Sequence, residues 1–201
     1  MKKLLLFSII AFTLVFAGCL QQPNVGNSNG TTQQKVSEAG LIGNITGFAL
    51  TANDTGFDVS DYSDLSPGEN GTQLTAAGFD TGFSVGLAKY DEQNFERIVH
   101  QVTRYKSREG ALKAFNETWK VIMEGNDVTA QLNLPKLADT QFGVKGSRTV
   151  NLGVKTATID DYIIVFVKSN VLVAVDYFGL TESTSEQKAL QFAQIAASKV
   201  G

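Results

Sequence analysis

The sequence predicts an α+β domain in which an antiparallel β-sheet carries two amphipathic helices. Two segments, 107–124 and 183–200, place apolar residues at intervals of three and four. Several segments between Gly78 and Phe178 instead alternate apolar and polar residues, which is typical of strands. The chain has 201 residues, which suits one domain with a substantial core. We therefore expect a single folded domain over residues 36–201.

Residues 1–18 have the layout of a secretory signal peptide. Lys2 and Lys3 give a positive start, and an apolar run over residues 4–17 follows. As a helix, residues 4–18 would measure roughly 22 Å at ~1.5 Å per residue. This is shorter than the ~30 Å hydrocarbon core of a bilayer. We therefore expect cleavage after residue 18 and not an uncleaved anchor helix.

The end of this segment carries a more specific pattern. Val15-Phe16-Ala17-Gly18-Cys19 resembles the lipobox of prokaryotic lipoproteins, although Phe16 stands where an aliphatic residue is usual. The resemblance implies that Cys19, the sole cysteine, carries a diacylglyceryl group. Acyl chains contribute ~0.8 kcal/mol per buried CH₂, so two chains would hold the protein at the membrane. We expect a protein anchored to the extracytoplasmic face of the cell membrane, with a plain cleaved signal peptide and a short anchor helix as the alternatives.

Residues 19–35 are predicted to form a disordered, lipid-anchored tether, because they contain almost nothing apolar to bury. Five Asn-X-Thr triplets are candidate glycosylation sites, where about two are expected by chance. They begin at Asn29, Asn44, Asn53, Asn70 and Asn116. Exposed loops rich in Asn, Gly and Thr would give the same pattern without modification. Lipid and glycans together would suit the outer surface of an archaeal cell.

The N-terminal part of the domain is predicted to hold one strand and a long loop. Residues 44–51 have strand-like composition, and glycines and aspartates dominate from there to Pro67. Residues 78–90 follow as a half-buried strand, with Phe79, Phe83 and Leu87 on one face. Residues 95–106 form the next strand.

The helix over 107–124 begins at Ser107, whose hydroxyl can accept from a free N–H of the first turn. We expect its Trp119 side to pack on the sheet as part of the main core. Residues 126–146 read as irregular. Three strands follow, over 149–160, 161–168 and 171–178, with Asp160-Asp161 marking a junction. The last helix begins near Ser183-Thr184-Ser185-Glu186, which has capping-box spacing.

The hairpin over 161–178 has two apolar faces, so both need a cover. We expect its turn at Ser169-Asn170 to rely on the tolerance of Asn for positive φ. We also expect both helices to lie on one face and the protein's own residues 36–71 to cover the other. If that cover is absent, the exposed face becomes a binding interface for a second copy or a partner. Its residues would be Tyr162, Ile164, Phe166, Val173 and Val175.

Three short stretches add a family resemblance that covers about 120 residues. Residues 106–111, 134–139 and 168–170 read KSREGA, LPKLAD and KSN. They resemble a pattern of secreted prokaryotic domains with the Mog1/PsbP-like α/β fold, although Ala138 stands where Gly is usual. The resemblance implies a sheet with packed helices and brings no set of catalytic residues.

Composition and motifs exclude several functions. The net charge is −3 and becomes more negative once Lys2 and Lys3 are removed, so nucleic acid is not an expected partner. No nucleophile elbow, phosphate loop or dinucleotide fingerprint occurs in the sequence, and no cofactor is expected. His100 is the only histidine and is interpreted as a half-buried structural residue on a strand.

The remaining candidate for chemistry is an acidic stretch that could wrap a calcium ion. Its carboxylates belong to Asp58, Asp61, Asp64 and Glu69, but their spacing does not match an EF-hand. The sequence therefore favours a lipid-anchored surface module that binds an envelope protein or a small ligand without catalysis. An envelope-acting enzyme and a calcium-dependent binding protein are the alternatives. Convergent carboxylates with raised pKa values in a pocket would favour the enzyme, and a broad apolar patch would favour the module.

Overall fold

The structure is a computed structural model that describes residues 41–66, 76–91, 94–125, 128–151 and 156–200. The signal peptide, Cys19 and the tether lie outside the described residues, as do Asn29, Glu69 and Asn70. In the part of the chain that is described, none of the helices has the length and apolar character of a membrane span. The α+β class predicted from the sequence is confirmed. The finer Mog1/PsbP-like resemblance stays a prediction.

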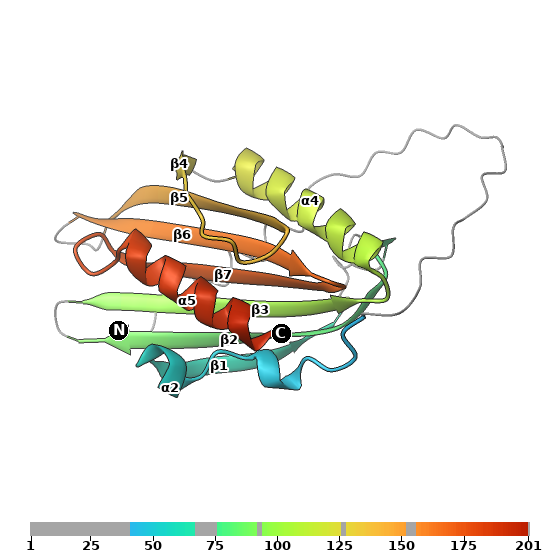
Figure 1. Ribbon diagram of the computed structural model, residues 1–201. Coiled ribbons are helices and arrows are strands. Elements are labelled where there is room, and N and C mark those ends of the chain that lie inside the picture. Colours follow the sequence, from blue (N-terminus) through green and yellow to red (C-terminus); the bar gives the residue numbers. More distant parts are fainter. Residues whose placement is uncertain (1–40, 67–75, 92–93, 126–127, 152–155, 201) are drawn as a thin grey trace, which may run out of the picture.

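A seven-stranded antiparallel sheet forms the centre of the domain (Figure 1). Its spatial order is β1-β2-β3-β7-β6-β5-β4, so the last hairpin lies in the middle of the sheet. The bounds of its strands are β1 Asp58–Leu65, β2 Phe79–Tyr90, β3 Phe95–Tyr105, β4 Val128–Gln131, β5 Thr140–Asn151, β6 Thr156–Lys168 and β7 Val171–Leu180.

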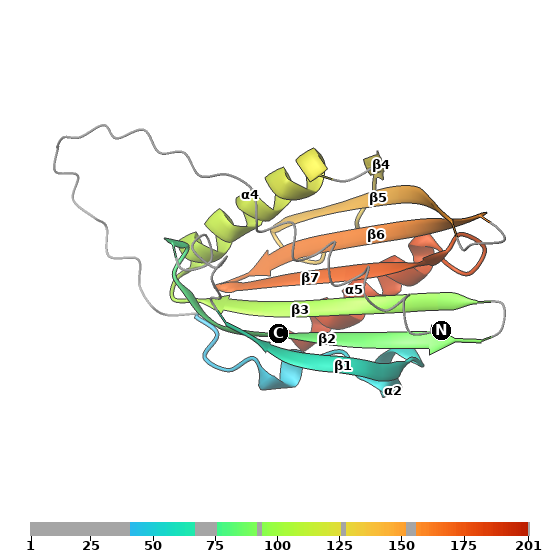
Figure 2. The same ribbon diagram turned by 180° about the vertical axis from the view of Figure 1, so that it is seen from behind.

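The two long helices, α4 (Arg108–Gly125) and α5 (Glu186–Lys199), pack on opposite faces of this sheet. The expectation that both cover one face is therefore wrong. Helix α4 is capped as the sequence indicates, since the Gly110 N–H donates to Ser107 Oγ at 3.1 Å. Helix α5 begins in the expected stretch, but its cap is Ser185, whose Oγ accepts from the Lys188 N–H at 3.3 Å, and the Ser183 to Glu186 capping-box spacing is not used. Figure 1 is drawn with α5 in front of the sheet, and Figure 2 shows the sheet in front of α5.

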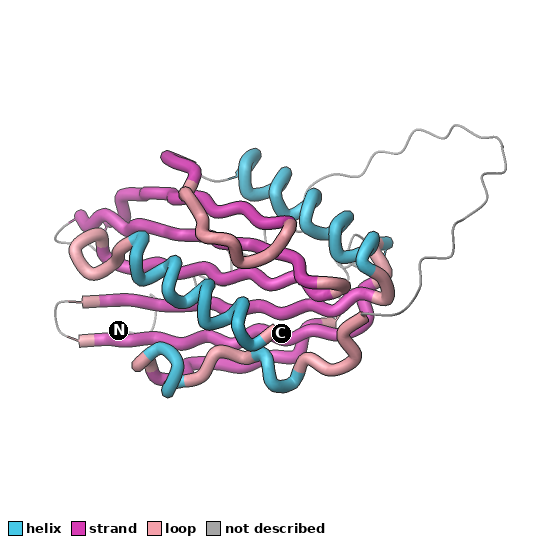
Figure 3. The backbone as a smooth tube through the Cα atoms, viewed as in Figure 1, coloured by secondary structure: helices cyan, strands magenta, loops and turns pink. Residues whose placement is uncertain are grey.

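The α5 face holds the larger core. The side chains of Ala189, Phe192 and Ala193 pack on the even-numbered residues of β6, and Ile45, Leu50 and Phe57 extend the same cluster. The N-terminal segment that supplies these last three residues includes the 3₁₀ turn η1 (Thr46–Phe48) and the short helix α2 (Ala52–Thr55). Figure 3 shows this segment beside α5, on the same face of the sheet.

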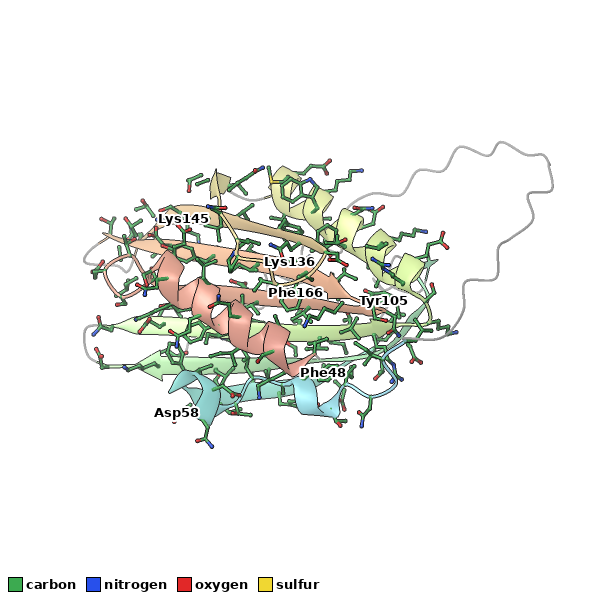
Figure 4. The ribbon with its side chains drawn as sticks, viewed as in Figure 1. Phe48, Asp58, Tyr105, Lys136, Lys145 and Phe166 are labelled. Carbon is green, nitrogen blue, oxygen red and sulfur yellow. The ribbon has the colours of Figure 1, made fainter. Side chains whose placement is uncertain are left out.

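The proposed interface residues belong to this core. All five are buried, and each is part of the cluster beneath α5. Figure 4 shows Phe166 beside α5. The alternative of an exposed interface at Tyr162, Ile164, Phe166, Val173 and Val175 is corrected, because the protein's own chain covers that face. The residue pairing of the hairpin itself is confirmed, with Ile164 opposite Val175 and Phe166 opposite Val173.

The α4 face has a smaller apolar cluster near one end of the sheet. Phe115 and Ile122 of α4 pack there on Val165 and Leu172. Trp119 also points to the sheet, and its ring lies 4.7 Å from that of Phe142 in an edge-to-face arrangement. Trp119 is only half-buried, so its placement in the main core is corrected to the margin of this second cluster.

Five local predictions are wrong. Residues 44–51 form η1 and irregular chain, whereas the expected loop contains β1. Residues 126–146 include β4 and the first half of β5. Asp160-Asp161 lies inside β6 and marks no junction. Phe79 packs on the α4 side, because the pairing of β2 with β3 shifts between Phe79 and Thr81.

The hairpin turn differs in a similar way. Ser169, and not Asn170, has positive φ, at 53°. The Asn170 side chain is buried and connects two distant segments. Its Oδ1 accepts from the Ile42 N–H at 2.7 Å, and its Nδ2 donates to the Tyr105 carbonyl at 2.7 Å. The residue expected to shape a turn therefore fastens the N-terminal segment to β3.

Candidate functional site: a charged half of the α4 face

One half of the α4 face carries charged residues in place of the apolar cluster. We call it the charged half-face and define it by Asp61, Arg97, Val99, Arg148, Asp161 and Asp176. Strand register places these six on the same side of the sheet, on strands β1, β3, β5, β6 and β7. Helix α4 covers the other half, and among the described elements no helix lies over this one (Figure 2).

An ion pair crosses β2 at one side of the charged half-face. Arg97 Nη2 donates to Asp61 Oδ2 at 2.7 Å, although the two residues lie on strands that are not neighbours. Gly86 of β2 permits this approach, because a Cβ there would collide with the Asp61 carboxylate. The Arg97 side chain is only 6% exposed, whereas that of Asp61 is 49% exposed. A buried guanidinium is therefore held by a carboxylate that reaches in from the rim.

Two carboxyl groups meet at the centre of the charged half-face. Asp176 lies opposite Ile163, and Asp161 lies opposite Phe178, so the two are diagonal neighbours on β7 and β6. Their side chains hydrogen-bond to each other. Burial raises the pKa of both, and the charge of Asp161 raises the pKa of Asp176 further, while Arg148 and Arg97 oppose the shift. The two carboxyl groups accordingly hold protons more strongly than free carboxyl groups do.

Three buried polar atoms at this place have no hydrogen-bond partner among the described residues. They are Oδ1 of Asp161, Oδ1 of Asp176 and Nε of Arg97. Asp176 is only 8% exposed, so its lone oxygen is largely removed from water as well. An unpaired buried polar group costs roughly 1–3 kcal/mol. The domain thus keeps two acceptors and one donor at neighbouring positions of three strands, an arrangement that is expected to lower its stability.

Aromatic rings border the charged half-face on the same side of the sheet. The Phe178 ring contacts that of Phe95 at 5.8 Å, and Phe95 stacks on Tyr90 at 5.3 Å. Phe178 is buried and lies opposite both Arg97 and Asp161, whereas Tyr90 is 60% exposed. The row therefore runs from the charged residues outward to an exposed ring.

Asp160, the neighbour of Asp161 in sequence, shows how different the opposite face is. It accepts from Lys145 Nζ at 2.8 Å and from Ser147 Oγ at 2.9 Å. Although burial opposes its ionisation, these hydrogen bonds hold the pKa of Asp160 below its ordinary value. Asp160 is thus a structural group whose two carboxylate oxygens both have partners, whereas Asp161 keeps one oxygen without a partner.

A further polar group on the α5 side is structural. The Tyr177 hydroxyl donates to Glu96, and Lys188 Nζ contacts the same carboxylate oxygen at 2.7 Å. Burial and the Glu96 carboxylate raise the pKa of Tyr177. Lys188 also donates to the Ser183 carbonyl at 2.8 Å. These contacts fasten the start of α5 to β3 and β7.

His100 is fully buried and not half-buried as the sequence indicated. Its Nδ1 accepts from the Leu50 N–H at 3.1 Å, so the proton of the neutral ring lies on Nε2. Burial lowers the pKa of His100 to about 3, with a smaller contribution from Lys199 in the same direction. The ring therefore stays neutral at ordinary pH and serves the core.

The calcium candidates do not converge. Asp58, Asp61 and Asp64 lie on the edge strand β1 and not in a loop. Asp58 and Asp61 share the α4 side, whereas Asp64 lies opposite Phe83 and so belongs to the other side. Figure 4 places Asp58 beside this edge, whereas Lys145 lies near the opposite edge of the sheet. The described residues contain no group of three or more His, Cys, Asp or Glu that could hold a metal ion.

Three of the glycosylation candidates are described, and all three are exposed. Asn53 lies on α2 and Asn116 on α4. Asn44 Oδ1 accepts from the N–H and the hydroxyl of Thr46, at 3.0 Å and 2.9 Å. None of these three belongs to the charged half-face.

A hollow with a volume of about 240 Å³ lies elsewhere, between α4, β5 and the segment that follows β4. Its lining includes Trp119, Leu132, Leu134, Gln141 and Phe142. No buried charge lines it, and Gln141 uses its amide to hold the chain at Pro135, Leu137 and Ala138. We therefore place the candidate site on the charged half-face and not in this hollow.

Sequence reasoning missed the central pair of this site. Asp161 was interpreted as part of a junction, and Asp176 was not considered. A signal was present, since Asp176 interrupts the apolar run of residues 171–178 at a position that faces a cover. A single carboxylate inside an otherwise apolar central strand is costly unless it has a partner or a function.

Comparisons with known proteins add little. No family model matches the chain, and no curated protein sequence is similar to it. Among solved structures, it is similar to the extracellular domain of PknH from Mycobacterium tuberculosis, with a TM-score of 0.41 and 15% sequence identity. That alignment covers 72% of this chain and 79% of the other. A similarity this distant carries no argument about function.

Proposed function

We propose that this protein is a lipid-anchored binding module on the extracytoplasmic face of the cell membrane, and that the charged half-face is its binding surface. The observation that supports the binding surface is the set of three buried, partnerless polar atoms on Asp161, Asp176 and Arg97. Evolution removes such groups easily when they have no use, because apolar residues of similar size are neutral or stabilising there. The ligand is an envelope protein or a small molecule, and no nucleic acid is expected.

The location rests on the sequence alone. The segment ending in Cys19 resembles a lipobox, and the Asn-X-Thr triplets suit an exported chain. Replacing Cys19→Ser in the native cell should release the protein from membranes or leave an uncleaved precursor. Mass spectrometry of the intact, purified native protein detects the lipid and the glycans in one measurement. Native protein that needs no detergent and has an unmodified Cys19 would contradict the anchor.

The binding surface is tested with the chain from residue 19 onward carrying Cys19→Ser, added to isolated cell envelopes. Val99 lies in the middle of the charged half-face and is half-buried, so Val99→Arg should block access. Val59→Arg is the matched control, because Val59 is 56% exposed and lies opposite Leu87 on the other side. We expect saturable envelope binding that falls at least tenfold with Val99→Arg and less than twofold with Val59→Arg. Equal binding by both folded variants would contradict this surface.

A second candidate is an enzyme that uses the same carboxyl pair. Two adjacent carboxyl groups with raised pKa values are suited to proton transfer. The enzyme ranks second because these carboxyl groups do not line the hollow beside Trp119, whereas convergent carboxylates in a pocket would favour it. The two functions predict different outcomes when the protein is incubated with isolated envelopes. An enzyme would release soluble fragments from the envelopes over time, and Asp176→Asn would stop the release while leaving binding largely intact. A binding module releases nothing and loses binding with Asp176→Asn.

A further inference from the structure

We infer that the charged half-face binds a ligand rich in neighbouring hydroxyl groups, which is the chemistry of a glycan. This inference rests on the proposed binding function and adds the class of ligand. Its basis is the kind of atom that lacks a partner, the balance of charge around these atoms and the aromatic row beside them.

The first argument concerns hydrogen-bonding capacity. The partnerless atoms are two carboxyl oxygens, which accept, and the Arg97 Nε–H, which donates. An ammonium group only donates and would leave Arg97 unsatisfied. A phosphate mainly accepts and would leave Asp161 and Asp176 unsatisfied. A hydroxyl both donates and accepts, so a group of hydroxyls is the ligand chemistry that suits both kinds of atom.

The second argument concerns charge. The charged half-face contains two cations, Arg97 and Arg148, against Asp61 and the Asp161–Asp176 pair. Because the pKa values of this pair are raised, its negative charge is reduced, and the two guanidinium groups oppose what remains. A site in which charges of both signs already oppose each other favours a neutral polar ligand over an ion, since it offers little to offset the desolvation of a charged one.

The third argument is the aromatic row. Phe178, Phe95 and Tyr90 lead from the carboxyl pair to an exposed ring. Sugar rings expose patches of C–H groups next to their hydroxyls, and such apolar patches pack well on the faces of aromatic rings. The half-face thus places hydroxyl-binding groups beside an apolar platform.

The test is an NMR titration of the same chain with methyl glycosides of mannose, glucose and galactose, up to 100 mM. Methylammonium and inorganic phosphate are the comparison ligands. We expect at least one glycoside to bind with millimolar affinity and to shift backbone amides around Asp176, Phe178 and Arg97. The two ions should bind at least tenfold more weakly at this place. Stronger binding of either ion, or no shift at these amides with any glycoside, would overturn the inference.

Variants separate the site from general effects. Asp176→Leu should weaken glycoside binding at least tenfold, because leucine has a similar branched shape and removes the acceptor oxygen without leaving another. Asp160→Asn is the matched control, since Asp160 belongs to the opposite side of β6, and should change binding less than twofold. Equal effects of the two variants would overturn the inference. If envelope binding depends on Val99 while no glycoside binds, the ligand class is wrong and the proposed function stands.

Discussion

The two faces of the sheet treat buried polar groups differently. On the α5 face, Asn170 and Glu96 are buried and paired, and together they fasten the N-terminal segment and α5 to the sheet. On the charged half-face, Arg97, Asp161 and Asp176 keep three polar atoms without a partner, whereas the described residues of the α5 face keep one, Nε2 of His100. The first face thus gains rigidity from most of its buried polar groups, whereas the second gathers the unpaired ones in one place.

This difference indicates where the domain has freedom to serve a function. Buried polar groups in proteins normally have hydrogen-bond partners, and close packing restricts their replacement. A buried polar group with all its partners is therefore accounted for by its role in the fold. Unsatisfied groups that cost stability are expected at sites that bind or react. Each prediction below weakens or sharpens this contrast, and they run from the largest expected effect to the smallest.

The largest effect is expected from a charge placed beneath α5. Ile164 is fully buried in the larger core, so Ile164→Lys should prevent folding, because an isolated buried ammonium costs several kcal/mol or more. Val59→Lys is the control on the same side at the exposed edge and should change the free energy of unfolding by less than ~0.5 kcal/mol. Circular dichroism and urea titration measure both. A folded Ile164→Lys monomer would mean that α5 does not cover this face.

The next effect is the acid sensitivity caused by His100. Its pKa is 6.5 when unfolded and about 3 when folded, so the unfolded chain binds more protons between these values. Stability is therefore complete above pH 6.5 and falls as the pH drops, by up to ~1.4 kcal/mol per pH unit. His100→Gln keeps an acceptor for Leu50 and does not titrate, so its stability should fall less between pH 6.5 and 4. If the free energy of unfolding changed with pH in the same way for both proteins, the pKa of His100 would not be lowered by folding.

A moderate contrast is expected between two aromatic residues. Phe166→Ala should cost ~3–5 kcal/mol, because Phe166 is fully buried in the larger core. Trp119→Ala should cost only about 2 kcal/mol, since Trp119 is half-buried at the margin of the α4 cluster. Chemical denaturation provides both values. A greater loss at Trp119 would make the α4 cluster the dominant core and reverse our ranking of the two faces.

The smallest expected effect is a gain in stability when Asp176 is replaced, and it is also the most informative one. The raised pKa of Asp176 means that stability present below pH 4 is lost as the pH rises through the folded pKa. Asp176→Asn removes this loss, so it should be more stable than the wild type by about 1 kcal/mol at pH 7 and by less at pH 4. Thermal unfolding at the two pH values measures the difference. A variant that is less stable at both would assign Asp176 a structural role.

The sequence predicts those features that depend on neighbours along the chain. Ser107 and the 183–186 stretch indicate where the two helices begin, and alternation gives the two faces of the central hairpin with their correct pairing. It fails at β1, whose residues are almost all exposed. Composition cannot indicate such a strand, because its extended form comes from pairing with β2 and not from burial of its side chains.

The sequence by itself determined that the central hairpin needs a cover on both faces, because apolar residues alternate on both sides of each strand. Only the tertiary structure decided that α4 and α5 take one face each, and that α4 leaves half of its face to charged residues. The same holds for the site. Arg97, Asp161 and Asp176 come from three strands, and their meeting depends on strand order and register, which arise when distant segments pair and leave no periodic trace in the chain.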